Sequence, residues 1–156
     1  MRYVRRVLQP GETVVYATRL HWLIYVRAAV LMVIAVAVAI TTSLVADKPN
    51  INLALWIVSA IFALLALSSA LRAFIRRATT ELAITDHRVI YKTGLLARHT
   101  LEMNRSKVES VDVDQTIPGR IFGYGTIIVR GTGGSLEPIR QIVDPLSFRS
   151  HLTVSG

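Results

Sequence analysis

The chain has 156 residues and a formal net charge of +8, with 18 Lys and Arg against 10 Asp and Glu, and it contains no cysteine. Disulfides and thiol-ligated metal sites are therefore excluded. Residues 1–78 carry nine basic and two acidic residues, whereas residues 79–156 carry nine basic and eight acidic residues. Because a nucleic-acid partner needs the basic excess clustered on a folded surface, this uneven distribution argues against nucleic-acid binding.

Two long apolar stretches dominate the first half of the chain, after an N-terminal segment of residues 1–21. Residues 28–46 and 53–71 are each 19 residues long and contain no charged residue. Each forms a helix of about 30 Å, the thickness of the hydrocarbon core of a bilayer. Neither has the polar stripe that a helix of a soluble bundle needs. The short connection of residues 47–52 therefore predicts an antiparallel transmembrane hairpin within residues 22–78.

Basic residues flank this hairpin on one side only. The connecting loop holds Lys48, which Asp47 offsets, whereas arginines lie before the first stretch and after the second. The positive-inside rule therefore predicts a multi-pass protein with both termini in the cytoplasm. The arginines that we expect to contact anionic lipid headgroups at the membrane surface are Arg19, Arg27, Arg72, Arg76 and Arg77.

Short β-like runs follow from residue 79 and predict a separate cytoplasmic domain over residues 79–156. The runs cover residues 79–85, 88–92, 95–103, 108–114, 125–130 and 137–143, with one helical turn at 117–122. Turn residues recur every 8–12 positions, which is typical of a small antiparallel β-barrel or sandwich. Asp144 and Pro145 then predict the start of a short C-terminal helix.

Several turn and strand motifs occur in a characteristic order. They are LQPGE at 8–12, HW at 21–22, TDHRVIY at 85–91, GLL at 94–96, VESVDVDQ at 108–115, GYGT at 123–126 and GTGG at 131–134. Together with the hairpin they resemble the bacterial membrane proteins that carry a pleckstrin-homology-like (PH-like) domain. The resemblance implies an α+β membrane protein, with a transmembrane helical hairpin followed by a PH-like β-barrel or sandwich. It leaves open whether residues 12–20 join the barrel or lie on the membrane.

No cluster of side chains in the sequence indicates chemistry. His21, His87, His99 and His151 lie on different elements without the spacing of a zinc-binding helix. Asp112 and Asp114 share the solvated face of an expected strand, and the glycines of 131–134 lack the Lys-Ser/Thr of a phosphate-binding loop. We therefore expect no catalytic, cofactor or metal site, and no enzymatic activity.

Basic residues of the expected domain remain as candidates for binding. PH-like domains that bind phosphoinositides carry a lysine and a basic-x-Arg group around their first hairpin, and here Lys92 and Arg98 flank such a turn. Position 100 is Thr, so the motif is incomplete and headgroup binding does not carry over with the fold. Lys92, Arg98 and Arg105 are kept as possible lipid or partner contacts.

These features favour a non-catalytic, membrane-anchored adaptor or scaffold at the inner (plasma) membrane of a bacterium. It would bind an unknown protein partner or a second copy of itself, since open sheet edges and small residues in both spans favour a homo-oligomer. The alternative is a small oligomeric transport or envelope-stress component of the membrane. A transport role needs ionisable residues inside the spans, and the two apolar stretches contain none.

Overall fold

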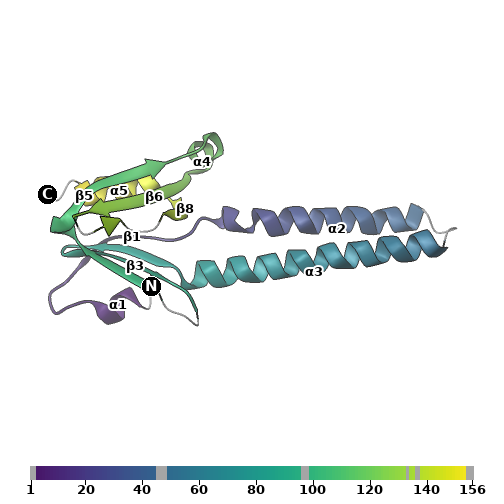
Figure 1. Ribbon diagram of the computed structural model, residues 1–156, viewed down its shortest axis with the longest axis horizontal. Helices are drawn as coiled ribbons and strands as arrows, with labels where there is room; N and C mark the ends of the chain where they lie inside the picture. The colour runs from purple at the N-terminus through teal and green to yellow at the C-terminus, as the bar shows by residue number, and fades with distance from the viewer. Residues whose placement is uncertain (1–2, 45–48, 96–98, 133, 136–137, 154–156) are drawn as a thin grey trace. The chain divides into compact units, whose positions relative to one another are not determined.

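The computed structural model describes residues 3–44, 49–95, 99–132, 134–135 and 138–153 (Figure 1). The chain forms two compact units. One, which we call the hairpin unit, is Trp22–Ile75. The other, the sheet unit, is discontinuous in sequence and combines Met1–His21 with Arg76–Gly156.

The hairpin unit consists of two long helices. A 3-10 turn, η1 (Trp22–Tyr25), leads into α2 (Val26–Leu44), and α3 (Pro49–Thr79) extends into the sheet unit. Both helices are long and apolar enough to cross a membrane, judged by length and composition. Only 11% of the most apolar window of each helix is buried. The positions and the apolar character of the two predicted helices are therefore as the sequence indicated.

Small residues pack the two helices of the hairpin against each other. Most of the buried residues recur at every seventh position, and these are Ala28, Ala35 and Thr42 on α2 and Ser59, Ala66 and Ala73 on α3. Ser69 on α3 is buried as well. Ser59 Oγ donates a hydrogen bond to the carbonyl oxygen of Ala35 at 2.9 Å, and the Asn52 amide donates to that of Thr42 at 3.2 Å. A seven-residue repeat of small and hydroxyl residues is typical of closely packed membrane helices.

The sheet unit contains two four-stranded antiparallel sheets. The first has the order β1-β2-β3-β4, and in the second β5, β6 and β7 follow one another while β8 also pairs with β6. The strands of the first sheet are β1 (Val14–Thr18), β2 (Glu81–Thr85), β3 (Arg88–Thr93) and β4 (His99–Asn104). Those of the second are β5 (Val108–Asp114), β6 (Tyr124–Gly131), β7 (Gly134–Ser135) and β8 (Ile139–Val143).

The two sheets do not close into a barrel, which corrects one of the two architectures predicted from the sequence. In the described part of the chain β4 pairs only with β3, and β5 only with β6. The turn η2 (Arg105–Lys107) separates β4 from β5, so the chain changes sheets there instead of continuing the ladder. An isolated antiparallel bridge between Leu20 and Ile142 links the segment after β1 to β8 of the second sheet. The structure instead has two separate antiparallel sheets.

A C-terminal helix contacts both sheets. Helix α5 (Pro145–Thr153) packs against β1 of the first sheet and against β5 and β6 of the second. Phe148 is completely buried and meets the Tyr16 ring edge to face at 6.3 Å. The Asp144 carboxylate accepts a hydrogen bond from the Ser147 backbone N–H at 3.3 Å, as expected for a residue that caps a helix. The predicted helix start is therefore confirmed.

The segment before the hairpin belongs to the first sheet. Strand β1 pairs with β2 from Val14 to Thr18. The sequence did not decide whether residues 12–20 join the domain or lie on the membrane, and β1 within this range joins the first sheet. A short helix, α1 (Val4–Val7), covers the outer face of that sheet, where Val4 packs with Ala83 and Ile90. Strand β2 is consequently buried on both faces.

Candidate functional site

Both connections to the hairpin leave the sheet unit at the same end. Strand β1 runs toward the hairpin and β2 returns from it, and the two are antiparallel neighbours with Thr18 opposite Leu82. The last residues of β1 and the first of β2 are therefore adjacent. We call this end of the sheet unit the hairpin end.

A cavity of the sheet unit lies at the hairpin end. It has a volume of about 500 Å³. Its lining comes from β1, the last turn of α3, the start of β2 and the end of β8, and comprises Tyr16, Ala17, Thr18, Arg19, Arg77, Ala78, Thr80, Glu81 and Val143. Two of the arginines that the sequence assigned to the membrane surface, Arg19 and Arg77, thus line one cavity although 58 residues separate them.

Glu81 is the acidic residue of this cavity, and its carboxylate is engaged. It accepts hydrogen bonds from the backbone N–H groups of Tyr3 at 3.4 Å and Val4 at 3.1 Å, at the start of α1. A carboxylate at that position satisfies helix N–H groups that have no partner within the helix. Glu81 therefore fastens the N-terminal segment to β2.

A second cavity of about 320 Å³ also lies at this end. Arg76, Asp114, Arg140 and Gln141 are among its lining residues, with Thr116, Tyr124, Gly125 and Thr126. Gln141 adopts a positive φ of 61°, which is uncommon for a residue other than glycine. Its carbonyl oxygen accepts a hydrogen bond from the His21 backbone N–H at 2.7 Å, which ties the end of the N-terminal segment to β8.

His21 is buried at the same place. Its ring lies 5.4 Å from that of Tyr124, and burial, assisted by the nearby Arg77 charge, lowers the pKa of His21 below its usual value. A hydrogen bond with the Phe122 backbone opposes this shift in the pKa. The imidazole therefore favours its neutral form and serves as a packed side chain.

The remaining predicted contact residues are distributed over both units. Arg27 is exposed on α2, and Arg72 on α3 donates a hydrogen bond to Ser68 Oγ at 3.3 Å. Lys92 lies opposite Glu81 in the sheet, and its Nζ is 5.6 Å from the centre of the Tyr3 ring. Arg98 lies outside the described residues.

Arg105 lies at the opposite end of the first sheet from Lys92. Its guanidinium donates hydrogen bonds to the carbonyl oxygens of His151 at 2.8 Å and Leu152 at 3.3 Å. Since a cation at a helix C-terminus satisfies carbonyl groups and the helix dipole, Arg105 caps α5. The structure does not bring Lys92 and Arg105 together.

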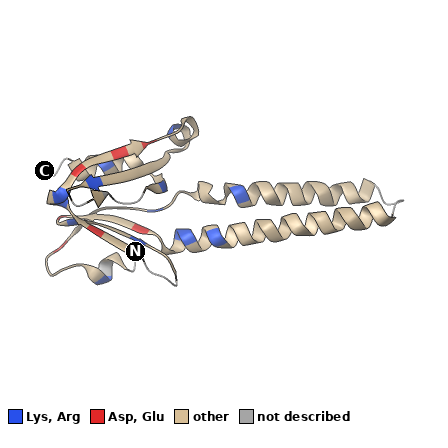
Figure 2. Ribbon diagram, viewed as in Figure 1, with Lys and Arg blue, Asp and Glu red and all other residues tan. Residues whose placement is uncertain are grey.

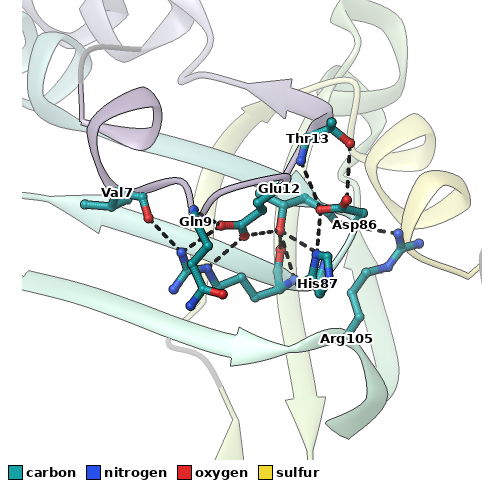
Figure 3. Close-up of polar contacts among 9 residues, drawn as sticks. Val7, Gln9, Glu12, Thr13, Asp86, His87 and Arg105 are labelled. Atoms are coloured by element: carbon teal, nitrogen blue, oxygen red, sulfur yellow. Dashed lines mark hydrogen bonds and ion pairs between the residues drawn. The ribbon is translucent and has the colours of Figure 1, made fainter.

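A buried ion pair that sequence reasoning missed holds the N-terminal segment on the sheet (Figure 3). The Glu12 carboxylate accepts two hydrogen bonds from the Arg88 guanidinium, each 2.9 Å long, and one from Thr85 Oγ1 at 2.7 Å. The same guanidinium donates to the Val7 carbonyl oxygen at 2.7 Å and to Glu102 at 2.7 Å. The arrangement is bidentate, with the Glu12 side chain 1% exposed and that of Arg88 15% exposed.

This ion pair sets the protonation of Glu12. The hydrogen bonds from Arg88 outweigh the effect of burial and lower the pKa of Glu12 from 4.5 to about 2. The adjacent loops are tied together as well, because Asp86 accepts hydrogen bonds from the Thr13 backbone N–H at 3.1 Å and from Thr13 Oγ1 at 3.3 Å. The charged groups of this network bind one another, so we assign the network a structural role, which is to hold the N-terminal segment on the first sheet.

Metal-ligand clusters do not occur among the described residues: no group of three His, Asp or Glu side chains could hold a metal ion. His87 contacts Asp86 at 2.8 Å, and the His151 ring stacks on Tyr16 at 4.5 Å. Asp112 forms an exposed ion pair with Arg130 at 2.7 Å, as expected for the solvated face of a strand.

Residues 13–153 match the family described as bacterial PH domain. The match covers most of the chain and includes both parts of the sheet unit. The chain belongs to the bacterial PH domain family. No curated protein and no solved structure shows a significant match.

The bacterial PH domain of this chain is interrupted by the hairpin. Its first strand precedes the two apolar helices, and its other strands follow them. Two of the motifs that carried the resemblance, LQPGE at 8–12 and TDHRVIY at 85–91, meet across this interruption through Glu12 and Arg88. No local pattern reveals that contact, because it joins residues 76 positions apart.

Proposed function

We propose that this protein is a non-catalytic, membrane-anchored adaptor or scaffold, whose bacterial PH domain binds a protein partner or a second copy of the chain at the inner leaflet. The observation that carries the proposal is the insertion of the hairpin between β1 and β2. Both ends of the anchor continue directly into paired strands of the domain, without an intervening linker. The domain is therefore held close to the surface that the helices enter.

The side chains of the hairpin unit support a membrane as its surroundings. Large apolar residues on both helices are exposed, among them Val33 at 68%, Leu44 at 79% and Leu64 at 67%. A soluble protein does not expose contiguous apolar surface of this kind without a partner. Lipid hydrocarbon covers such surface at no cost in hydrogen bonding, since the backbone groups of a helix are paired internally.

The distribution of charge supports the orientation. Figure 2 colours the Lys and Arg residues of the chain blue. The basic residues of the two helices lie in the first turn of α2 and in the C-terminal part of α3, and these are Arg27, Arg72, Arg76 and Arg77. The positive-inside rule places these helix ends in the cytoplasm, with anionic lipids nearby. The bacterial PH domain and the N-terminal segment would then both lie on the cytoplasmic side.

A role in binding is favoured over transport and over catalysis. In the described parts of the two apolar helices, Lys, Arg, Asp and Glu occur only toward the start of α2 and the end of α3. A transported ion or proton would therefore find no charged side chain to bind along the middle of the helices. Strand β4 pairs only with β3 in the described part of the chain, so one of its edges is open. An open antiparallel edge can accept a strand from a partner.

Site-specific photocrosslinking in living cells tests the proposal. A photoreactive residue is placed in the full-length chain at His99 on the β4 edge or, as the control, at the exposed Arg149 on α5. A discrete adduct from His99 that is absent from Arg149 is expected, and mass spectrometry then identifies it as a partner or a second copy. Absence of an adduct from both positions, together with a detergent-corrected mass of one 17.3 kDa chain, would contradict the proposal.

A further inference from the structure

The short helix α4 (Ile117–Phe122) exposes most of its large apolar side chains. Ile117 is 77% exposed, Ile121 is 73% exposed and Phe122 is 52% exposed. Pro118 between them is exposed as well. Three large apolar residues on one six-residue helix form an apolar tip at the connection between β5 and β6 (Figure 1).

The apolar tip is held rigidly by its flanking residues. Thr116 caps the helix by accepting a hydrogen bond from the Gly119 N–H at 3.2 Å, and Gly123 ends it in the left-handed conformation with φ of 71°. A Cβ on Gly119 would lie 2.6 Å from the Tyr124 carbonyl oxygen, so the helix backbone packs tightly on β6. The exposure of the apolar side chains is therefore a property of the fold and does not result from fraying.

Hydrogen bonds place α4 at the hairpin end of the sheet unit. Tyr124, two residues after α4, lies opposite Val143 in the ladder, and the Val143 N–H donates to the Arg19 carbonyl oxygen at 3.1 Å. The ring of His21 lies 5.4 Å from that of Tyr124. Since His21 is the last residue of the sheet unit before Trp22, α4 lies at the end of the sheet unit where the N-terminal segment leaves it.

The charges around the apolar tip suit an anionic lipid surface. Arg120 is exposed on α4 itself, and Arg140 on β8 is exposed nearby in the second cavity with Arg76. Asp114 is the acidic residue of that cavity, and the exposed Asp144, whose N–H donates to the Gly123 carbonyl oxygen at 3.0 Å, is a second acidic residue beside α4. The three arginines still outnumber these two acids. Apolar side chains combined with flanking arginines are the composition of segments that bind at the membrane interface, where they reach about 5–10 Å below the headgroups.

We propose that α4 inserts Ile117, Ile121 and Phe122 into the interfacial region of an anionic bilayer, and thereby fixes the bacterial PH domain against the membrane surface. This rests on the proposed function, because it requires the hairpin to span the same bilayer. The hairpin then supplies attachment, and α4 supplies a third contact that restricts rotation of the domain about its two connections. The exposed arginines around it contact the headgroups.

Depth-dependent fluorescence quenching tests the insertion on the full-length chain. The protein has no cysteine, so single variants Ile121→Cys, Leu64→Cys and Glu109→Cys each carry one environment-sensitive fluorophore. Leu64 lies in the middle of α3, and Glu109 lies at the exposed start of β5, away from α4. The labelled proteins are reconstituted into vesicles of phosphatidylcholine and phosphatidylglycerol that contain lipids spin-labelled at a shallow or a deep position.

We expect the shallow label to quench the probe at Ile121 more strongly than the deep label, the deep label to quench the probe at Leu64, and neither to quench the probe at Glu109. Quenching at Leu64 without quenching at Ile121 would overturn the insertion of α4 and leave the membrane anchor intact. A blue-shifted but unquenched probe at Ile121 would also overturn it, because protein would then cover α4. Absence of quenching at Leu64 would overturn the anchor and, with it, this inference.

Discussion

Apart from α4 and a few other exposed positions, the large apolar side chains of the sheet unit lie inside, whereas most of those of the hairpin unit lie outside. Phe148, Ile84 and Ile127 are completely buried. On the hairpin, by contrast, Leu64 and Val33 are among the most exposed residues, and the buried seam consists of small residues such as Ala35 and Ala66. One chain therefore follows two opposite rules of packing, which is the pattern expected when its two parts have different solvents.

The two units obey the same rule for polar groups. The sheet unit buries Glu12 with Arg88, and the hairpin unit buries Ser59 against the Ala35 carbonyl oxygen. No buried side-chain nitrogen or oxygen lacks a hydrogen-bond partner in the described residues. Burial of polar groups without partners is costly in either medium, so the comparison isolates apolar packing as the feature that distinguishes the units.

The largest effect is expected when the buried ion pair of the sheet unit is broken. Glu12→Ala leaves the Arg88 guanidinium buried without its main partner, which should lower the free energy of unfolding of this unit by about 3–5 kcal/mol. Hydrogen exchange of the β2 and β3 amides in the full-length, detergent-solubilised protein measures this change.

Asp112→Ala is the matched control for Glu12→Ala, since it removes an exposed ion pair with Arg130. We expect Asp112→Ala to lower the free energy of unfolding by about 0–1 kcal/mol. Equal changes for the two variants would show that Glu12 does not fasten the N-terminal segment to the sheet.

A charge in the hairpin unit should have the next largest effect. Leu65 lies on the exposed surface of α3, near the middle of the helix, and Leu65→Arg adds about 2.5–3.5 kcal/mol to the free energy of membrane insertion. The yield in the membrane fraction after alkaline extraction should fall sharply, whereas Leu65→Phe should insert normally. An unchanged yield for the arginine variant would mean that lipid does not surround α3.

Acid should loosen the sheet unit in a defined range. The pKa of Glu12 is about 2 in the folded state and 4.5 ordinarily, so its ion pair contributes full stability above about pH 4.5. That contribution is lost as the pH falls from there toward 2, because the unfolded state then binds the proton more readily. Near-UV circular dichroism during acid titration should show the loss, and Glu12→Gln should flatten the curve. Identical titration curves for the wild-type chain and Glu12→Gln would show that Glu12 does not cause the loss of stability in acid.

The smallest expected effect concerns the seam of the hairpin unit. Ser59→Ala removes the hydrogen bond to the Ala35 carbonyl oxygen and should weaken helix–helix association by about 0.6–2 kcal/mol. Ser68→Ala is the control, since Ser68 bonds within its own helix to the Leu65 carbonyl oxygen. Cysteine crosslinking between α2 and α3 in the membrane would report a looser pair only for Ser59→Ala.

The sequence predicted the elements well because hydropathy and turn residues are local signals. The two apolar helices, most of the strands and the start of α5 at Pro145 all followed from such patterns. The barrel, one of the two architectures predicted, does not form. Whether a barrel closes depends on whether β4 and β5 hydrogen-bond across η2, which is not a local property of the sequence. The sequence pointed to small residues in both spans without showing which of them pack, and on α2 Ala35 is buried whereas Ala37 is exposed.

The candidate site was only partly predictable. The arginines around the hairpin were found by their position next to the apolar stretches, whereas the meeting of Arg19 with Arg77 in one cavity requires the pairing of β1 with β2. The role of α1 as a cover and the contact of Glu12 with Arg88 depend on residues far apart in sequence. The exposed residues of α4 looked in sequence like an ordinary helical turn, because burial is not encoded locally.

The accessibility of single cysteines in intact cells tests the central claim, that the hairpin crosses a membrane and interrupts a bacterial PH domain on its cytoplasmic side. Asn50 at the start of α3 and Glu109 on β5 are both exposed in the structure and far apart in the chain. A membrane-impermeant maleimide should label Asn50→Cys in intact cells and Glu109→Cys only after permeabilisation. Labelling of both variants in intact cells, or of neither, would contradict the account.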